Sequence, residues 1–414
     1  MFPIFQDVNF VIREISALIV LLNKLCMFLL LFSLARILGV ELYGVFSYHY
    51  AIVTGIATVV GECLSIALSR YIVINPEKVD IKTSFGLMLW GGGLVGVLSV
   101  IIFSVFPAPA AAQQLNVFGL LVGVFLLGVA CVCNLTVTGL MFALDVSRRW
   151  VCALAVHGIL GLIIVVGVVW IYGRVEGAIF GLAICTLVAP VSGLLITRRF
   201  KLVSHQGKQF FSLQKMKDLL KSSGAPSIAG SMLLGGPIHI ICLMVFARAS
   251  LNVSEVGYFN LFFLFYILVT VLPSALASYA IVKLAGSAHA SKMYLLVGVV
   301  ISVILPTLLI VSKGYWLCLL GSDYCGKGEL LFYAALAGGV GLVTTIVTQI
   351  LHSVNLSRVV FLASCVYASI YLLGTIFMAV RSPMSAIDLF KVFLLALVSQ
   401  ILVLAILGGR KIVR

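Results

Sequence analysis

Long apolar runs, separated by short polar segments, follow one another along the whole chain. Each run has about 20 residues, the length that a helix needs to cross a hydrocarbon core about 30 Å thick. The pattern predicts an all-α polytopic membrane protein with about twelve transmembrane helices. We place the spans at about residues 15–35, 44–67, 84–106, 117–143, 151–172, 177–197, 223–247, 258–280, 293–312, 329–352, 358–379 and 388–409.

Composition and charge support a membrane protein. Hydrophobic residues make up 63% of the chain and charged residues only 10%, whereas about 25% of the residues of soluble domains are charged. Most of the 27 Lys and Arg residues fall in alternate polar segments, which predicts that these segments and both termini are cytoplasmic. The net charge of +14 therefore reflects topology, and no nucleic-acid partner is expected. The first span is expected to be a retained helix rather than a signal peptide.

The sequence does not indicate catalytic chemistry. A membrane glycosyltransferase or polymerase would need a catalytic acid or base on a sizeable loop, but the outer segments, such as 107–116, are short. The ten cysteines lie mostly inside apolar runs and lack the paired spacing of a zinc site. We therefore expect a transporter rather than an enzyme, with no catalytic residues, metal site or cofactor.

The two halves of the chain repeat. Gly44-Val-Phe46 matches Gly257-Tyr-Phe259 at an offset of 213 residues, and Ala35-Arg36 and Ala247-Arg248 precede the two glycines. Each half has six spans, an even number, so the two copies should share orientation and be related by an axis along the membrane normal. We expect an N-terminal lobe at 1–206, a cytoplasmic linker with an amphipathic helix at 207–222, and a C-terminal lobe at 223–414.

Two ionisable residues lie inside the first two apolar runs. A charged side chain near a bilayer centre costs roughly 2.5–3.5 kcal/mol. If Arg13 and Arg70 mark the same membrane face, Lys24 and Glu62 lie about 16 Å and about 12 Å deep. Three interpretations stay open: an internal ion pair that fixes packing, snorkelling of Lys24 to the membrane surface, and a cavity-lining role in transport.

The second half departs from the repeat at the position that matches Lys24. That position is Pro237, within Gly235-Gly-Pro-Ile-His239, and it predicts that the span 223–247 is bent or broken there. Backbone carbonyls freed by such a break need protein or water as partners. His239 beside the break is therefore either a cavity ligand or a hydrogen-bonded core histidine.

Several short motifs, taken in their order along the chain, carry a resemblance to a known family. They lie at 35–46, 70, 145–148, 177–183, 219–226 and 255–259. Together they resemble the bacterial O-antigen and polysaccharide-unit flippases of the multidrug/oligosaccharidyl-lipid/polysaccharide exporter superfamily. The resemblance implies a MATE-like fold of two six-helix lobes around a central cavity. It also implies movement of an undecaprenyl-diphosphate-linked sugar repeat unit across the bacterial cytoplasmic (inner) membrane. The related peptidoglycan-precursor flippases usually have two further helices.

A flippase of this kind needs positive charge for the diphosphate and polar groups for the sugar. The candidates for the diphosphate are Lys24, Arg36 and Arg248; those for polar contacts are Asn23, Tyr48, His49, Tyr50, His239 and Asn260. The alternative function is a cation-coupled MATE-type exporter of small amphiphilic compounds, which would more typically centre on acidic groups. Expected partners are membrane lipid and the lipid-linked glycan; a polysaccharide polymerase and a chain-length regulator are further candidates.

Lys24 and Glu62 suggest a mechanism. We expect Lys24 to be the principal buried contact for the diphosphate, and Glu62 to hold it when the site is empty. An arriving diphosphate would take the ammonium as its partner and leave Glu62 more easily protonated. Glu62 is thus the candidate coupling residue, with the choice between proton and sodium coupling open.

Overall fold

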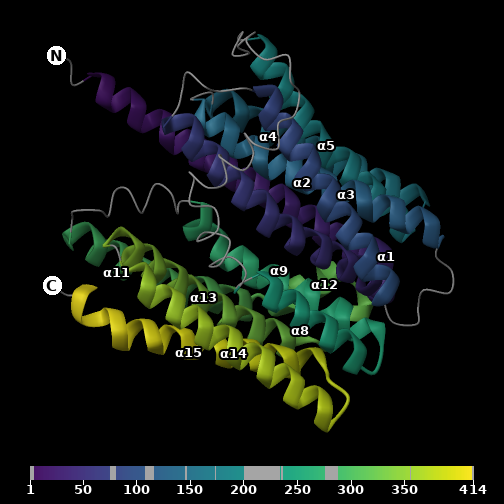
Figure 1. Cartoon of the computed structure of the whole chain (residues 1–414). Coiled ribbons are helices and arrows are strands. Elements are labelled where there is room, and N and C mark those ends of the chain that lie inside the picture. Colours follow the sequence, from purple (N-terminus) through teal and green to yellow (C-terminus); the bar gives the residue numbers. More distant parts are fainter. Residues whose placement is uncertain are drawn as a thin grey trace. The chain divides into compact units, whose positions relative to one another are not determined.

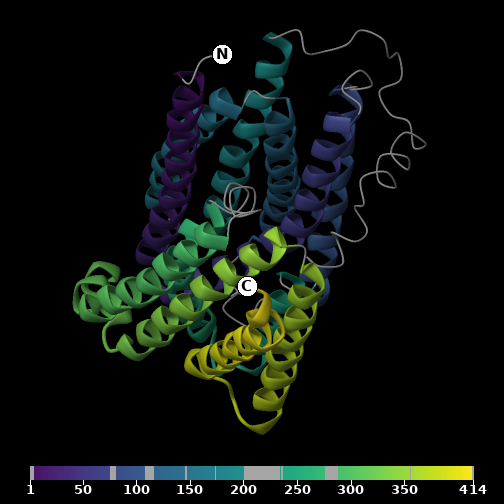
Figure 2. The ribbon, with the colours of Figure 1, turned by 90° about the vertical axis from the view of Figure 1, so that its left-hand side faces the viewer.

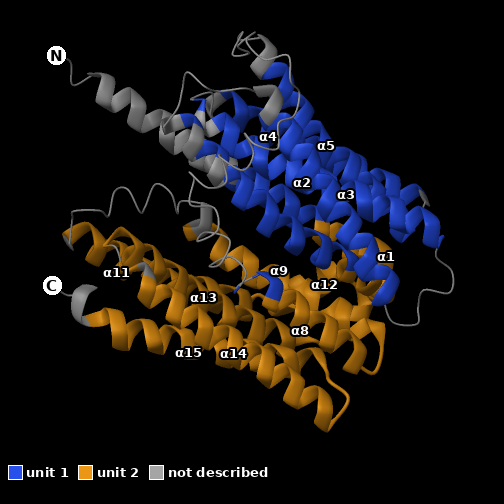
Figure 3. Ribbon diagram, viewed as in Figure 1, with its two compact units in different colours: residues 1–30, 49–108, 112–237 blue, residues 31–48, 109–111, 238–414 orange. Residues whose placement is uncertain are grey.

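Every long element of the described chain is a helix, in agreement with the apolar pattern (Figure 1). The structure is a computed structural model, and it describes residues 4–74, 81–107, 116–144, 147–172, 174–199, 234, 236–275, 288–354 and 356–412. The chain divides into two compact units. Unit 1 comprises residues 1–30, 49–108 and 112–237, and unit 2 comprises residues 31–48, 109–111 and 238–414 (Figure 3).

The helices match the predicted spans. They are α1 (Ile4–Ile74), α2 (Ile81–Val105), α3 (Val117–Ala143), α4 (Ser147–Tyr172), α5 (Val175–Arg199), α8 (Gly236–Ala249), α9 (Val253–Ala275), α11 (Ala288–Val311), α12 (Lys313–Leu320), α13 (Gly328–Ser353), α14 (Ser357–Arg381) and α15 (Ala386–Ile412). In the described residues, ten helices are long and apolar enough to cross a membrane. One of them, α1, carries the first two predicted spans. The predicted fold class, an all-α multi-pass membrane protein, is confirmed.

The link between the first two spans is shorter than predicted. The sequence indicated two helices joined by residues 36–44, but α1 is helical throughout except at Gly39, where φ is 71° and ψ is 168°. This left-handed conformation costs glycine little because it has no Cβ atom. A single residue therefore makes the break, and the charged positions on both sides of it stay helical.

The seventh predicted span is described mainly in its second half. The helix α8 begins at Gly236, so Pro237 lies in its first turn, where the missing N–H has no helical partner to lose. The proline thus lies at the start of a described helix, and the predicted bend or break in the span 223–247 stays a prediction. Residues 223–233 and 235 lie outside the described residues, as does the predicted linker helix at 207–222.

The two units use the same order of helix packing. In unit 1, where the helices run side by side (Figure 2), α3 packs against α2 and α5, and α5 packs against α4. In unit 2, α13 packs against α11 and α15, and α15 packs against α14. Because α2, α3, α4 and α5 correspond in chain order to α11, α13, α14 and α15, the repeat seen in the sequence is a repeat of structure.

The unit boundaries cross the sequence halves. Residues 31–48, in the middle of α1, belong to unit 2 together with the helices of the C-terminal half (Figure 3). A division of the chain at 206–222 assigns these residues to the N-terminal lobe. The helix α1 therefore takes part in both units, although it is nearly continuous.

Gly44 of α1 and Gly257 of α9 face each other where the two helices cross inside unit 2. A Cβ atom at Gly44 would lie 3.1 Å from the backbone nitrogen of Gly257 and would meet the carbonyl oxygen of Val253. A Cβ atom at Gly257 would lie 3.2 Å from the backbone nitrogen of Gly44 and would meet the carbonyl oxygen of Val40. The contact is reciprocal, and the two backbones approach this closely because both residues are glycine.

A hydrogen bond next to the glycine contact joins a second repeat-matched pair. The Asn260 amide donates to Ser47 Oγ at 3.1 Å, and the two residues are 213 positions apart, the offset of the sequence repeat. Their exposed fractions are 8% and 3%. Since matched residues meet their own counterparts, a local two-fold relation links these segments of α1 and α9.

The first prediction concerns the glycine contact. Gly44→Ala and Gly257→Ala should each lower the free energy of unfolding by about 1–3 kcal/mol, because the added methyl group meets backbone atoms that cannot rotate away. Reversible unfolding of the purified protein in mixed micelles measures this change. Gly93→Ala is the control, since a Cβ atom there meets nothing within 4 Å. Equal stability of all three variants would contradict a close crossing.

The second prediction concerns the Ser47–Asn260 hydrogen bond. A double-mutant cycle with Ser47→Ala and Asn260→Ala should give a coupling energy of about 0.6 kcal/mol, the size found for interhelical hydrogen bonds in membranes. The same unfolding assay supplies the four stabilities. A coupling energy of zero would mean that the two side chains do not interact in the native protein.

Candidate functional site

Lys24 and Glu62 both lie on α1 in unit 1. Lys24 is exposed, and Glu62 is half-buried. The charge of Lys24 acts on the Glu62 carboxyl, but within the described part of the chain no direct ion pair joins the two side chains. The ammonium is therefore near its counter-charge while its hydrogen-bond donors remain available to another group.

Asn23 faces a different neighbour from Lys24. Its side-chain oxygen lies against Gly158 of α4, in the space that a Cβ atom would need. Beside this glycine, His157 has both ring nitrogens buried. The backbone of Cys185 is its polar neighbour, yet neither ring nitrogen reaches hydrogen-bonding geometry with any group that the structure describes. Asn23 thus packs α1 against α4, and His157 adds a polar group to this packing.

Arg36 and Arg248 occupy matching positions of the repeat in unit 2. Both side chains are exposed, and each follows a buried alanine, Ala35 or Ala247. Arg36 lies three residues before the break at Gly39, and Arg248 lies in the last turn of α8. The charge of Arg248 also acts on Tyr48. Both guanidinium groups are therefore carried at helix ends and are accessible.

The loop between α12 and α13 packs against the break in α1. Tyr324, in the 3₁₀ helix Ser322–Tyr324, donates its hydroxyl hydrogen to the Ala35 carbonyl at 3.3 Å, and burial raises the pKa of this hydroxyl, so it stays a donor. A carboxylate oxygen of Asp323 lies 3.5 Å from where a Cβ atom of Gly39 would be. The sequence analysis did not identify Asp323 or Tyr324, because no local pattern links them to a helix nearly 300 residues earlier.

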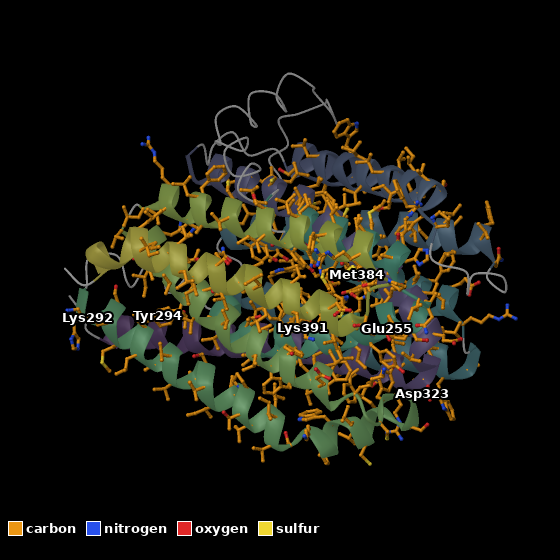
Figure 4. All side chains as sticks on the ribbon, turned by 90° about the horizontal axis from the view of Figure 1, so that it is seen from below. Glu255, Lys292, Tyr294, Asp323, Met384 and Lys391 are labelled. Carbon is orange, nitrogen blue, oxygen red and sulfur yellow. The ribbon has the colours of Figure 1, made fainter. Side chains whose placement is uncertain are left out.

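The turn between α8 and α9 is held in a similar way by the loop before α15. The backbone N–H of Ala386 donates to the Glu255 carboxylate at 2.6 Å, and that of Met384 donates to the Ala249 carbonyl at 3.0 Å. Figure 4 shows that Glu255, Asp323 and Met384 gather at one end of unit 2, away from Lys292 and Tyr294. The two arginines thus project from a firmly hydrogen-bonded end of this unit.

His239 is held by aromatic side chains. Its Nδ1 atom lies 3.2 Å from the Tyr371 hydroxyl, and its ring stacks on Phe263 with centroids 4.5 Å apart. The side chain is half-buried. The sequence left open a cavity ligand or a hydrogen-bonded core histidine. Nδ1 is hydrogen-bonded, as in the second interpretation, whereas Nε2 has no hydrogen bond in the described structure.

The remaining polar candidates lie mainly in helix packing. Tyr48, His49 and Asn260 are 1%, 3% and 8% exposed, and Asn260 is bonded to Ser47. Tyr50 is half-buried. The described residues contain no group of three or more side chains that could hold a metal ion. Among the candidates from the sequence, the exposed charged side chains are therefore Lys24 in unit 1 and Arg36 and Arg248 in unit 2.

Comparison with known protein families gives one match over most of the chain. Residues 14–282 match the family model described as polysaccharide biosynthesis protein. None of the curated protein sequences matches this chain.

Solved structures share the fold over nearly the full length. A lipid II flippase MurJ in an inward closed conformation is 14% identical, with a TM-score of 0.73, and the match covers 97% of this chain and 90% of that chain. An outward-facing MATE family multidrug transporter of the MOP superfamily is 13% identical, with a TM-score of 0.67 and coverages of 97% and 95%. A MOP superfamily transporter from Pyrococcus furiosus, described as having a binding pocket of reverse polarity, is 14% identical, with a TM-score of 0.61 and coverages of 96% and 94%.

These matches agree with the packing described above. At such low identity the structural matches show the fold alone, whereas the family match covers more than half of the sequence. The chain belongs to the polysaccharide biosynthesis protein family and has the fold shared by MurJ and the MATE transporters of the MOP superfamily.

Proposed function

We propose that this protein is a flippase that moves an undecaprenyl-diphosphate-linked oligosaccharide, an O-antigen or related polysaccharide repeat unit, across the bacterial cytoplasmic membrane by alternating access. Membership of a polysaccharide biosynthesis family and a fold shared with a lipid II flippase support it. In the proposed orientation both termini are cytoplasmic. A polysaccharide polymerase and a chain-length regulator are its proposed partners.

The observation that carries the proposal is the accessible ammonium of Lys24 within an apolar helix. A lysine at such a position is costly unless a partner or water compensates its charge. Glu62 supplies a counter-charge without a direct ion pair. A diphosphate can therefore bind the ammonium through charge-assisted hydrogen bonds without first breaking a salt bridge.

Glu62 is the proposed coupling group. While Lys24 is without substrate, its charge favours the ionised form of the carboxyl group. Once a diphosphate neutralises the ammonium, Glu62 is left half-buried beside an anion, and its protonation becomes more favourable. Proton uptake would then accompany substrate binding; sodium uptake at the carboxylate is the alternative form of coupling.

Export of small amphiphilic cations is the second candidate function. The half-buried carboxyl group of Glu62 and the fold shared with MATE transporters favour it. The exposed charged residues among the candidates from the sequence, Lys24, Arg36 and Arg248, are all cationic, which favours an anionic substrate instead. Two assays distinguish the functions. Resistance of an expressing strain to amphiphilic cations would support the exporter, and loss of surface polysaccharide on deletion would support the flippase.

The third prediction tests Lys24. Lys24→Ala should abolish complementation of a flippase-deficient strain and weaken binding of undecaprenyl diphosphate by roughly 10–150-fold, the loss of a charge-assisted hydrogen bond. Lys24→Arg should keep partial activity. Lys24→Ala combined with Glu62→Gln should recover the folding stability that Lys24→Ala alone loses, because no uncompensated carboxylate remains. It should not recover export, because the ammonium is still missing.

The matched control is Lys292→Ala, at the exposed start of α11, which should complement normally. Surface polysaccharide and membrane abundance are measured together. Normal surface polysaccharide from a well-expressed Lys24→Ala protein would remove Lys24 from the mechanism.

The fourth prediction tests Arg36 and Arg248. In a variant that lacks the exposed thiols of Cys152, Cys318 and Cys325, Arg36→Cys and Arg248→Cys should react with a membrane-impermeant maleimide added from outside. Undecaprenyl-diphosphate-linked glycan should slow both reactions, because both sites contact it. Lys313→Cys, at an exposed residue of α12, should react at the same rate with and without glycan. If the glycan changes neither reaction rate, both arginines are interfacial anchors, which hold the helices at the membrane surface and do not contact the substrate.

A further inference from the structure

Unit 2 contains an aromatic cluster formed by four helices. Phe393 of α15 is buried, with 2% exposure, and aromatic rings from α8, α9 and α14 surround it. Their centroids lie 5.0 to 6.4 Å from that of Phe393. We call these residues the aromatic cluster: His239, Phe263, Tyr266, Tyr367, Tyr371 and Phe393.

The rings of this cluster are ordered rather than randomly packed. His239 stacks on Phe263 at 4.5 Å and 21°, and Phe263 stacks on Tyr266 at 4.9 Å and 27°. The three rings therefore form a continuous stack along one side of Phe393. His239, Phe263, Tyr266 and Tyr367 are only half-buried, so the cluster is partly accessible.

Three polar atoms of the cluster lack hydrogen-bond partners. They are the hydroxyl groups of Tyr266 and Tyr367 and Nε2 of His239; in the described structure no group bonds to any of them. Buried tyrosine hydroxyls usually find a partner, and unpartnered polar groups are costly where water is scarce. Their presence on one cluster indicates a ligand that supplies the missing bonds.

The chemistry of the cluster is neutral. The polar groups that act on Tyr367 and Tyr371 are other tyrosines and the Cys242 thiol, with no carboxylate, lysine or arginine among them. A tyrosine hydroxyl both donates and accepts. When Tyr371 donates to Nδ1 of a neutral His239, Nε2 carries the ring proton and is a donor. The six side chains of the cluster therefore offer flat apolar faces with both donors and acceptors, and none of them is a lysine, an arginine or a carboxylate.

We propose that the aromatic cluster is a sugar-binding subsite. One sugar ring of the glycan stacks on an accessible aromatic face of the cluster, and the hydroxyl groups of that sugar bond to Tyr266, Tyr367 and His239. A sugar ring presents apolar C–H faces and hydroxyl groups that donate and accept, which matches this set. An anionic diphosphate would gain no charge-assisted bond here. The inference rests on the proposed function and adds to it the part of the protein that binds the glycan rather than the lipid.

The fifth prediction compares lipids with and without sugar. The purified protein in nanodiscs is titrated with undecaprenyl diphosphate and with undecaprenyl diphosphate carrying glucose, galactose or N-acetylglucosamine. Tyr266→Phe with Tyr367→Phe keeps both rings and removes both hydroxyls. This double variant should bind the preferred sugar-bearing lipid roughly tenfold more weakly, from the loss of two hydrogen bonds, and should bind undecaprenyl diphosphate as the wild type does.

Two controls define the test. Tyr315→Phe removes the hydroxyl of a tyrosine that is 65% exposed on α12 and should change neither affinity. Lys24→Ala should weaken both kinds of lipid, because the diphosphate is common to them.

The outcomes separate the subsite from the function on which it rests. If the wild type binds both lipids and the double variant binds the sugar-bearing lipid equally well, the subsite is refuted and the flippase proposal stands. If the double variant instead loses affinity only for tetraphenylphosphonium, the cluster is a site for amphiphilic cations and the sugar proposal is wrong. A wild type that binds none of the undecaprenyl lipids overturns both proposals.

Discussion

The close approach of α1 and α9 at Gly44 and Gly257 constrains the rest of unit 2. Backbone atoms replace side chains at this crossing, so the two helices have one register in which they fit, and a shift by one residue would bring larger side chains into the contact. The Ser47–Asn260 hydrogen bond lies in the same register. Because α1 is nearly continuous, this crossing also fixes the position of Arg36 in unit 2. It likewise fixes where the break at Gly39 contacts the loop that contains Asp323 and Tyr324.

A membrane-spanning protein must satisfy the backbone groups that a helix break frees, and unit 2 does so with distant segments. Tyr324 reaches the Ala35 carbonyl, and the backbone of Met384 reaches the Ala249 carbonyl. Ala35 lies four residues before the break in α1, and Ala249 is the last residue of α8. Both carbonyls thus accept a hydrogen bond from a loop of the C-terminal half.

The polar groups proposed to contact the substrate fall into two chemical classes. Lys24, Arg36 and Arg248 are accessible cations that suit phosphate oxygens. The aromatic cluster has no formally charged side chain, and the hydroxyls of Tyr266 and Tyr367 have no hydrogen-bond partner among the described residues, which suits a polyol. A lipid-linked glycan has both kinds of group in one molecule. Charge alone is therefore an incomplete description of the candidate residues.

The sequence by itself determined the span positions, the internal repeat and the unusual charges at Lys24 and Glu62. These follow from local composition: a run of about 20 apolar residues must cross the bilayer, and a charge inside it is costly wherever the helix packs. Only the tertiary structure decided that residues 31–48 join unit 2, that Gly44 meets Gly257, and that Asp323, Tyr324 and the aromatic cluster surround particular positions. The apolar pattern does not specify helix neighbours, because every face of a membrane helix is hydrophobic and lipid and protein are equally apolar surroundings. The contacts that choose among neighbours are close backbone approaches and hydrogen bonds between residues hundreds of positions apart, and these exist only once the helices have packed.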